Sequence, residues 1–250
     1  MTNDQIHSRV DLLDGGVTLL TVAGTLDGVT YRPLRDLIVK AALEEPRAVI
    51  IDINDLAVPA ESALAVFTSA RWHVARWPDV PLLLVSGTER GRNMLRRNGI
   101  TRYVPAYVTV REATEAAAAH SFPGRKRARV ELEPDAPSVV LSRELVAEWL
   151  ADWSRSELTP AANVVVTALV ENAVRHAGGA TALRLEIKDD ELTVAVEDNS
   201  VIPARFRENA LGRSELSSLK IVDAVCRSWG CSPTATGKVV WCVVGPENTL

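Results

Sequence analysis

The first half of the chain alternates apolar runs with amphipathic segments. Runs rich in β-branched and other apolar residues predict strands at residues 16–22, 48–53, 80–86 and 107–110. Apolar positions that recur every three or four residues predict helices at residues 31–43, 62–74, 89–98 and 112–119. Gly99 follows the third helix and suits the left-handed residue that closes a helix. Helices packed on a sheet in this order predict an α/β domain.

The second half has a different order of elements. Amphipathic patterns predict helices at residues 142–153, 159–176 and 216–228. Thr159-Pro160 suits the start of the second of these helices, because proline is tolerated in a first turn. Residues 182–187 and 191–197 alternate and predict a hairpin that turns at Asp189-Asp190, and residues 237–244 predict a last strand. Strands grouped apart from helices predict an α+β domain.

A change in composition separates the two halves. Residues 120–137 hold prolines, a glycine, a basic run at 125–129 and an acidic stretch at 131–135. Such segments rarely build a core, so they predict a solvated linker between domains at 1–119 and 138–250. The alternative for the basic run is a contact with an acidic partner surface.

Composition narrows the classes of partner. The chain has 250 residues, of which 47% are hydrophobic and 24% charged, and its net charge is -4. We therefore expect no nucleic-acid partner, and no apolar run approaches the roughly 20 residues that span a bilayer, so we expect no membrane partner. Cys226, Cys231 and Cys242 lack metal-ligand spacing and are interpreted as reduced packing thiols of a cytoplasmic protein.

One stretch of the first half carries a family resemblance. A short loop and a predicted helix follow residues 47–56, whose sequence is Arg-Ala-Val-Ile-Ile-Asp-Ile-Asn-Asp-Leu. An earlier turn has the sequence Gly24-Thr25-Leu26-Asp27. This order resembles the STAS domain of anti-sigma-factor antagonists over residues 8–119. The resemblance implies a phosphorylated serine in an Asp-Ser-Ser/Thr-Gly motif at the helix start. Here the stretch is Ala60-Glu61-Ser62-Ala63, so Glu61 stands at the acceptor position.

Glu61 has two interpretations. A carboxylate at a helix N-terminus is stabilised as a phosphate would be, so Glu61 could hold the domain in a phosphorylated-like state. Alternatively, Glu61 is an acid favoured at a helix start, with Ser62 as the cap. Ser62 is also the remaining hydroxyl of the motif that a kinase could phosphorylate.

Three motifs of the second half carry another resemblance. They are Val170-Glu171-Asn172-Ala173-Val174-Arg175-His176-Ala177, Val196-Glu197-Asp198-Asn199-Ser200 and Gly237-Lys238-Val239-Val240-Trp241. Residues 138–250 resemble the ATP-binding domain of anti-sigma-factor serine kinases in the GHKL (histidine kinase-like ATPase) superfamily. The resemblance implies ATP or ADP with magnesium held by Asn172, and adenine recognised by Asp198. The implied nucleotide-binding residues are Asn172, His176, Asp198, Ser218, Gly237 and Lys238.

The same region departs from the family where the chemistry occurs. The family's Glu-x-x-x-Asn has Ala168 at the base position, and an alanine cannot accept a proton. Glu171 is next to Asn172, but neighbouring helical positions point about 100° apart, so we do not expect it to substitute. The glycine-rich lid falls at residues 216–219, where both glycines are replaced, with Gly212 and Arg213 upstream. We therefore expect no catalytic residue.

These observations favour a bacterial partner-switching regulator of sigma-factor activity. It would join a non-phosphorylatable antagonist-like domain to a degenerate, pseudokinase-like ATP-binding domain. Its partners would be an antagonist, an anti-sigma factor or a sigma factor, and a homodimer through the second domain is compatible with the resemblance. The alternatives are an active serine/threonine kinase that acts on a separate antagonist, and a nucleotide-independent binding scaffold. Tethering in one chain also suggests that the two domains contact each other, or that one masks the partner surface of the other.

Overall fold

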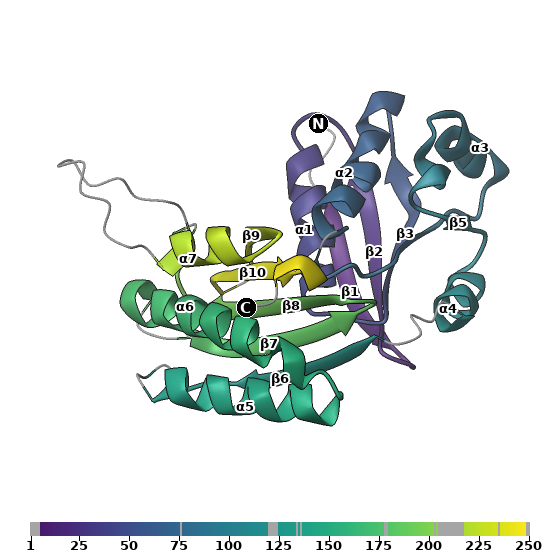
Figure 1. Cartoon of the computed structure of the whole chain (residues 1–250). Helices are drawn as coiled ribbons and strands as arrows, with labels where there is room; N and C mark the ends of the chain where they lie inside the picture. The colour runs from purple at the N-terminus through teal and green to yellow at the C-terminus, as the bar shows by residue number, and fades with distance from the viewer. Residues whose placement is uncertain are drawn as a thin grey trace. The chain divides into compact units, whose positions relative to one another are not determined.

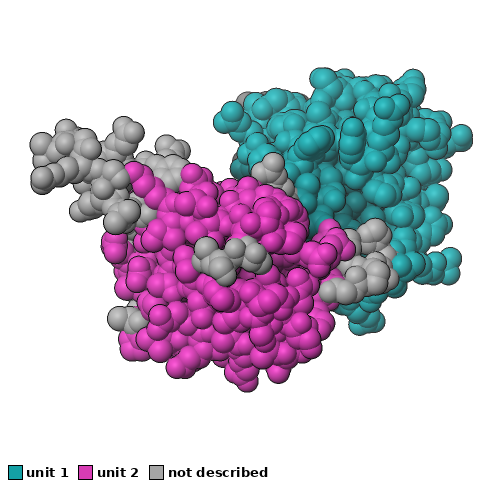
Figure 2. Space-filling model, viewed as in Figure 1, with its two compact units in different colours: residues 1–121 teal, residues 122–250 magenta. Residues whose placement is uncertain are grey.

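The structure is a computed structural model, and it describes residues 6–75, 77–119, 125–133, 135, 137–177, 180–202, 204, 218–234 and 236–248. The chain divides into two compact units, Met1–Ser121 and Phe122–Leu250, which Figure 2 colours separately. Each unit has its own five-stranded sheet. The first unit matches the predicted α/β class, and the second unit has a sheet with helices as predicted for α+β.

The first unit is built on a sheet of order β1-β2-β3-β4-β5 (Figure 1). β1 pairs antiparallel with β2, and the other neighbours are parallel. The strands are β1 (His7–Leu13), β2 (Val17–Thr25), β3 (Ala48–Ala57), β4 (Leu82–Val85) and β5 (Ala106–Tyr107). The helices are α1 (Tyr31–Leu43), η1 (Glu61–Leu64), α2 (Ala65–Val74), α3 (Glu89–Arg97), η2 (Ile100–Arg102) and α4 (Val110–Ala119).

Alternation along β3 distributes its side chains over both faces of this sheet. Ile50 packs in a cluster with Leu83 of β4 and with Ala113 and Ala117 of α4. Its neighbour Ile51 is fully buried on the opposite side, as the period of two requires. A strand buried on both faces explains why residues 48–53 read as a continuous apolar run.

The start of α1 is fixed by a carboxylate. Asp27 Oδ1 accepts hydrogen bonds from the backbone N–H groups of Val29 and Thr30, at 2.8 and 2.9 Å, and from the Thr30 hydroxyl. These hydrogen bonds lower the pKa of Asp27, because they favour the ionised carboxylate. The Thr30 N–H has the largest effect, the Thr30 hydroxyl the next and the Val29 N–H the smallest. The Gly24–Asp27 turn therefore ends in the acid that positions α1.

The second unit is built on an antiparallel sheet of order β6-β7-β8-β10-β9. Val165 and Leu169 of α6 pack against Leu185, Val194 and Val240 in one core. The helices α5, α6 and α7 lie along the same face (Figure 1). The strands are β6 (Lys126–Glu131), β7 (Ala180–Lys188), β8 (Glu191–Asp198), β9 (Ser228–Pro233) and β10 (Lys238–Val244). The helices are α5 (Ser138–Asp152), η3 (Ser156–Leu158), α6 (Thr159–Ala177), α7 (Ser218–Val225) and η4 (Pro246–Asn248).

Several predicted elements have other bounds in the structure, and three of the differences have a clear structural reason. The predicted helix at 62–74 begins as the 3-10 turn η1 and becomes α-helical at Ala65. The predicted helix at 216–228 ends at Val225, because Ser228 already pairs with Val243 in the sheet. The short strand predicted at 107–110 lies at 106–107, since α4 starts at Val110.

The predicted linker contains a strand of the second sheet. β6 pairs with β7, and the basic run meets carboxylates there. Glu186 lies 2.9 Å from Arg125 and 2.6 Å from Arg127, and Glu197 lies 2.9 Å from Arg184 and 4.0 Å from Arg129. The expectation that the basic run is solvated was therefore wrong, because opposite charges across neighbouring strands stabilise a sheet. Residues 120–124 lie outside the described residues.

Candidate functional site

The STAS-like motif presents a carboxylate that is held at both oxygens. Glu61 opens η1, and its Oε1 lies 3.1 Å from the Arg97 guanidinium. The Asn98 side-chain amide donates to Glu61 Oε2 at 2.7 Å. Arg97 and Asn98 come from the C-terminal end of α3, so two elements far apart in sequence meet at this group.

Ser62 does not cap the helix. The N-cap of η1 is Ala60, which makes no side-chain cap hydrogen bond, and Ser62 lies inside the 3-10 turn with an exposed side chain. The expectation that Ser62 is the cap was wrong, because the turn begins one residue earlier, at Glu61. The hydroxyl of Ser62 is reachable from solvent.

In the second unit, Asp198 and Lys238 form a buried ion pair. Asp198 ends β8, Lys238 begins β10, and the two face each other in the sheet register. The Lys238 ammonium lies 2.7 Å from Asp198 Oδ1, and the side chains are 5% and 1% exposed. The Ser200 N–H also donates to that oxygen at 2.8 Å. Asp198 and Lys238, two of the predicted nucleotide-binding residues, are thus paired with each other.

Gly237, the residue before Lys238, lies very close to the end of β8. A Cβ at Gly237 would lie 1.9 Å from the Asp198 carbonyl oxygen and 2.7 Å from the Asn199 Cα. Only a residue without a side chain allows this approach of two backbones. The glycine of the Gly-Lys motif is required by packing, whatever it does toward a ligand.

Two of the other predicted nucleotide residues are buried. Asn172 lies on α6 and Ser218 begins α7, and each is 7% exposed. The side chain of His176 lies outside the described residues, as do Gly212, Arg213, Leu216 and Ser217 of the predicted lid.

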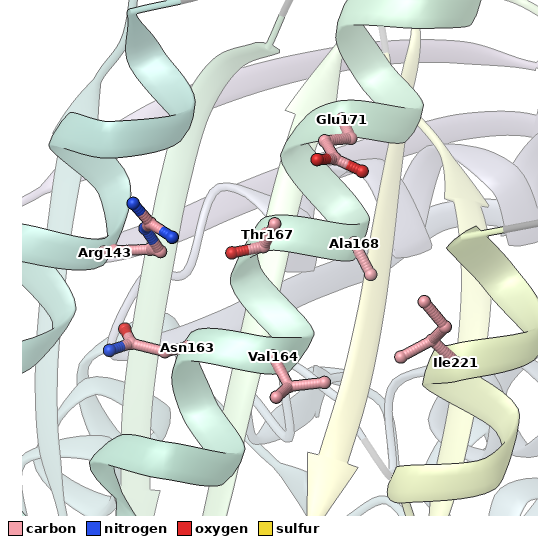
Figure 3. Close-up of a pocket in the computed structure, with 7 residues that line it drawn as sticks. All are labelled: Arg143, Asn163, Val164, Thr167, Ala168, Glu171 and Ile221. Carbon is pink, nitrogen blue, oxygen red and sulfur yellow. The ribbon is translucent and has the colours of Figure 1, made fainter.

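A hollow of about 390 Å³ crosses the outer side of α6. Figure 3 shows α6 in the centre, with Arg143 of α5 on one side and Ile221 of α7 on the other. Ala168 and Glu171 both line it, because residues three apart share a helix face. Glu171 therefore brings a carboxylate beside the expected base position, although Asn172 is absent from the lining. The full lining is Arg143, Asn163, Val164, Thr167, Ala168, Glu171 and Ile221.

The three cysteines are free thiols, as predicted. Burial raises the pKa of Cys231 and of Cys242, since a thiolate is poorly solvated in a core. Thiols that remain protonated are weak nucleophiles and weak ligands. No group of three or more His, Cys, Asp or Glu side chains that could hold a metal occurs among the described residues.

A match to a protein family identifies a domain in the first unit. The STAS domain family matches residues 12–113, and this part of the chain is a STAS domain. An anti-sigma factor antagonist from Mycobacterium paratuberculosis is 22% identical with a TM-score of 0.41, over 46% of this chain and 97% of that one. The Bacillus cell fate determinant SpoIIAA in its phosphorylated form is 14% identical with a TM-score of 0.34, over 44% and 98%. No curated protein matches this chain.

None of the described helices has the length and apolar character needed to cross a membrane.

Proposed function

We propose that this chain is a protein-binding regulator of the partner-switching type that controls a sigma factor. In this proposal the STAS domain binds an antagonist, an anti-sigma factor or a sigma factor in the cytoplasm. The main support is the carboxylate of Glu61, which Arg97 and Asn98 hold at the position where the motif otherwise has its phosphorylated serine. A fixed charge there gives a domain whose state no kinase can change.

The contacts of Glu61 are those that a phosphate would attract. Arginine and amide donors converge on the two oxygens, and charge-assisted bonds of this kind are shorter and stronger than neutral ones. A carboxylate carries about one charge where a phosphate carries nearly two, so Glu61 mimics a phosphoserine in part. We infer that Arg97 and Asn98 can bind either a carboxylate or a phosphate on the side chain at position 61.

Replacing Glu61 with serine is expected to create a phosphorylation site. We expect an ATP-loaded anti-sigma-factor kinase from the host to transfer radiolabelled phosphate to E61S and to leave the wild-type chain unlabelled. The variant should fold normally, because the pair with Arg97 is exposed and such pairs contribute less than about 1 kcal/mol.

The matched control is the double variant E61S/S62A. It should be labelled as E61S is, whereas S62A alone should stay unlabelled. Label on Ser62 of the wild-type chain would contradict the proposal, since the motif would then still contain a working acceptor.

We further propose that the second unit is a degenerate GHKL-type module whose nucleotide site is weakened. Three observations support this. Ala168 provides no base, Asp198 already bonds Lys238, and the order of helices and strands is the one expected for that superfamily. Asp198 Oδ1 already accepts from the Lys238 ammonium and the Ser200 N–H, and the side chain is 1% exposed, so an adenine amine must compete for a carboxylate that is buried and paired.

Calorimetric titration with Mg-ATP and Mg-ADP tests this module. We expect either no saturable heat or a dissociation constant in the millimolar range, because Asp198 is buried and already paired with Lys238. N172A should not change the weak signal by more than about twofold. Tight binding that N172A abolishes, together with phosphate transfer to an antagonist, would instead identify an active serine/threonine kinase.

A further inference from the structure

The STAS domain exposes two large aromatic rings side by side. Trp72, in the last turn of α2, is 67% exposed, and Tyr103, directly after η2, is 52% exposed. Their ring centroids lie 6.1 Å apart with the planes inclined by 49°. Tryptophan and tyrosine are usually well covered in a monomer, and exposed pairs of rigid rings are enriched where proteins bind one another.

The chain beside these rings is strongly basic. The segment from α3 to η2, residues 89–102, contains five arginines and one acid, Glu89, although the whole protein has a net charge of -4. The five are Arg90, Arg92, Arg96, Arg97 and Arg102. Local charge of this density attracts an oppositely charged partner and steers its approach.

In the described part of the chain, Arg96 and Arg102 lack an acidic partner. Among the residues that the structure describes, no carboxylate lies within ion-pair distance of Arg96 or Arg102, and both are exposed. The Arg96 guanidinium donates to the neutral Asn93 amide at 2.7 Å, which leaves its charge uncompensated. Arg97 is partly neutralised by Glu61.

The basic segment touches the neighbourhood of α2 at two places. Asn98 and Arg97 contact Glu61 just before α2, and Tyr103 contacts Trp72 in the last turn of α2. The segment 96–103 thus runs beside the whole of α2, a helix of 10 residues and so about 15 Å long.

We propose that Trp72, Arg96, Arg97, Arg102 and Tyr103 form a docking surface for an acidic protein segment that carries an apolar side chain. Carboxylates of the segment pair with Arg96 and Arg102, and its apolar side chain covers the two rings. The inference rests on the proposed function, in that the segment belongs to the protein that the STAS domain binds. A protein is favoured over nucleic acid because nucleic-acid-binding domains are basic overall and this chain is acidic.

Fluorescence anisotropy of the full chain with a labelled peptide tests the surface. The probe is a peptide of glutamates interrupted by single leucines, compared with the same peptide carrying serine for leucine and with a labelled oligothymidylate. We expect saturable binding of the leucine peptide, weakened about tenfold or more by R96E/R102E and by W72Q. Serine for leucine should weaken it by a similar factor.

The matched control is R32E/R175E, which reverses two exposed arginines elsewhere in the chain. It should bind the peptide as the wild type does, and thermal melting should show that all variants fold. Equal weakening by both double variants, absence of saturation, or tighter binding of the oligothymidylate would overturn the proposal. This readout does not involve phosphorylation at position 61, so its failure is distinct from failure of the proposed function.

Discussion

Replacing Lys238 with methionine is expected to lower the free energy of unfolding of the second unit by about 3–5 kcal/mol. The substitution removes the ammonium that lies 2.7 Å from Asp198 Oδ1 and leaves a carboxylate that is 1% exposed. Methionine fills a similar volume, so the loss comes from the uncompensated charge and not from a cavity. Urea denaturation followed by tryptophan fluorescence and far-ultraviolet circular dichroism measures it.

Two variants show whether the effect comes from the buried pair. In K238M/D198N the charge is removed on both sides, and most of the stability should return, because an amide oxygen can still accept the Ser200 N–H. R9A breaks the exposed pair with Asp11 and should cost less than about 1 kcal/mol. A loss below about 1 kcal/mol in K238M would mean that water reaches Asp198 and that the site is open to ligands.

How far the fold could be predicted depended on burial. Residues 31–43 form α1 with the predicted bounds, because one buried helix face imposes a period of three to four residues. The run at 48–53 lies within β3, because a strand buried on both faces is apolar throughout. β1 and β6 are edge strands with largely exposed or charged side chains, so no apolar period marks them. The segment that contains the β6 arginines was interpreted as a linker, because their partner Glu186 is about sixty positions away in the chain.

For the candidate sites, local motifs could be predicted from the sequence, whereas contacts between distant residues could not. A local motif predicted the importance of Glu61, but its partners Arg97 and Asn98 are 36 and 37 residues away and no pattern links them. Lys238 was predicted as a nucleotide-binding residue from its motif alone. Its bond to Asp198, 40 residues earlier, follows from the β8–β10 register, which the sequence does not specify. Whether the site takes a nucleotide therefore stays a prediction.

Replacing Gly237 is the second change with a large expected effect on stability. G237A is expected to destabilise the second unit by about 3 kcal/mol or more, because the new methyl would overlap the Asp198 carbonyl oxygen and the backbone of Asn199. Both obstacles are backbone atoms, so no side-chain rotation relieves them and β8 and β10 must separate where Lys238 meets Asp198. The shift in the urea midpoint gives the magnitude.

Gly28 is the matched control, since a Cβ there has nothing within 4 Å. G28A should change stability by less than about 0.5 kcal/mol. If G237A is as stable as G28A, the two strands are not in close contact at this point, and the Gly-Lys motif would then need a ligand to explain it. If G237A is destabilised and K238M is destabilised with it, the glycine and the lysine of that motif are both accounted for by the contact between β8 and β10.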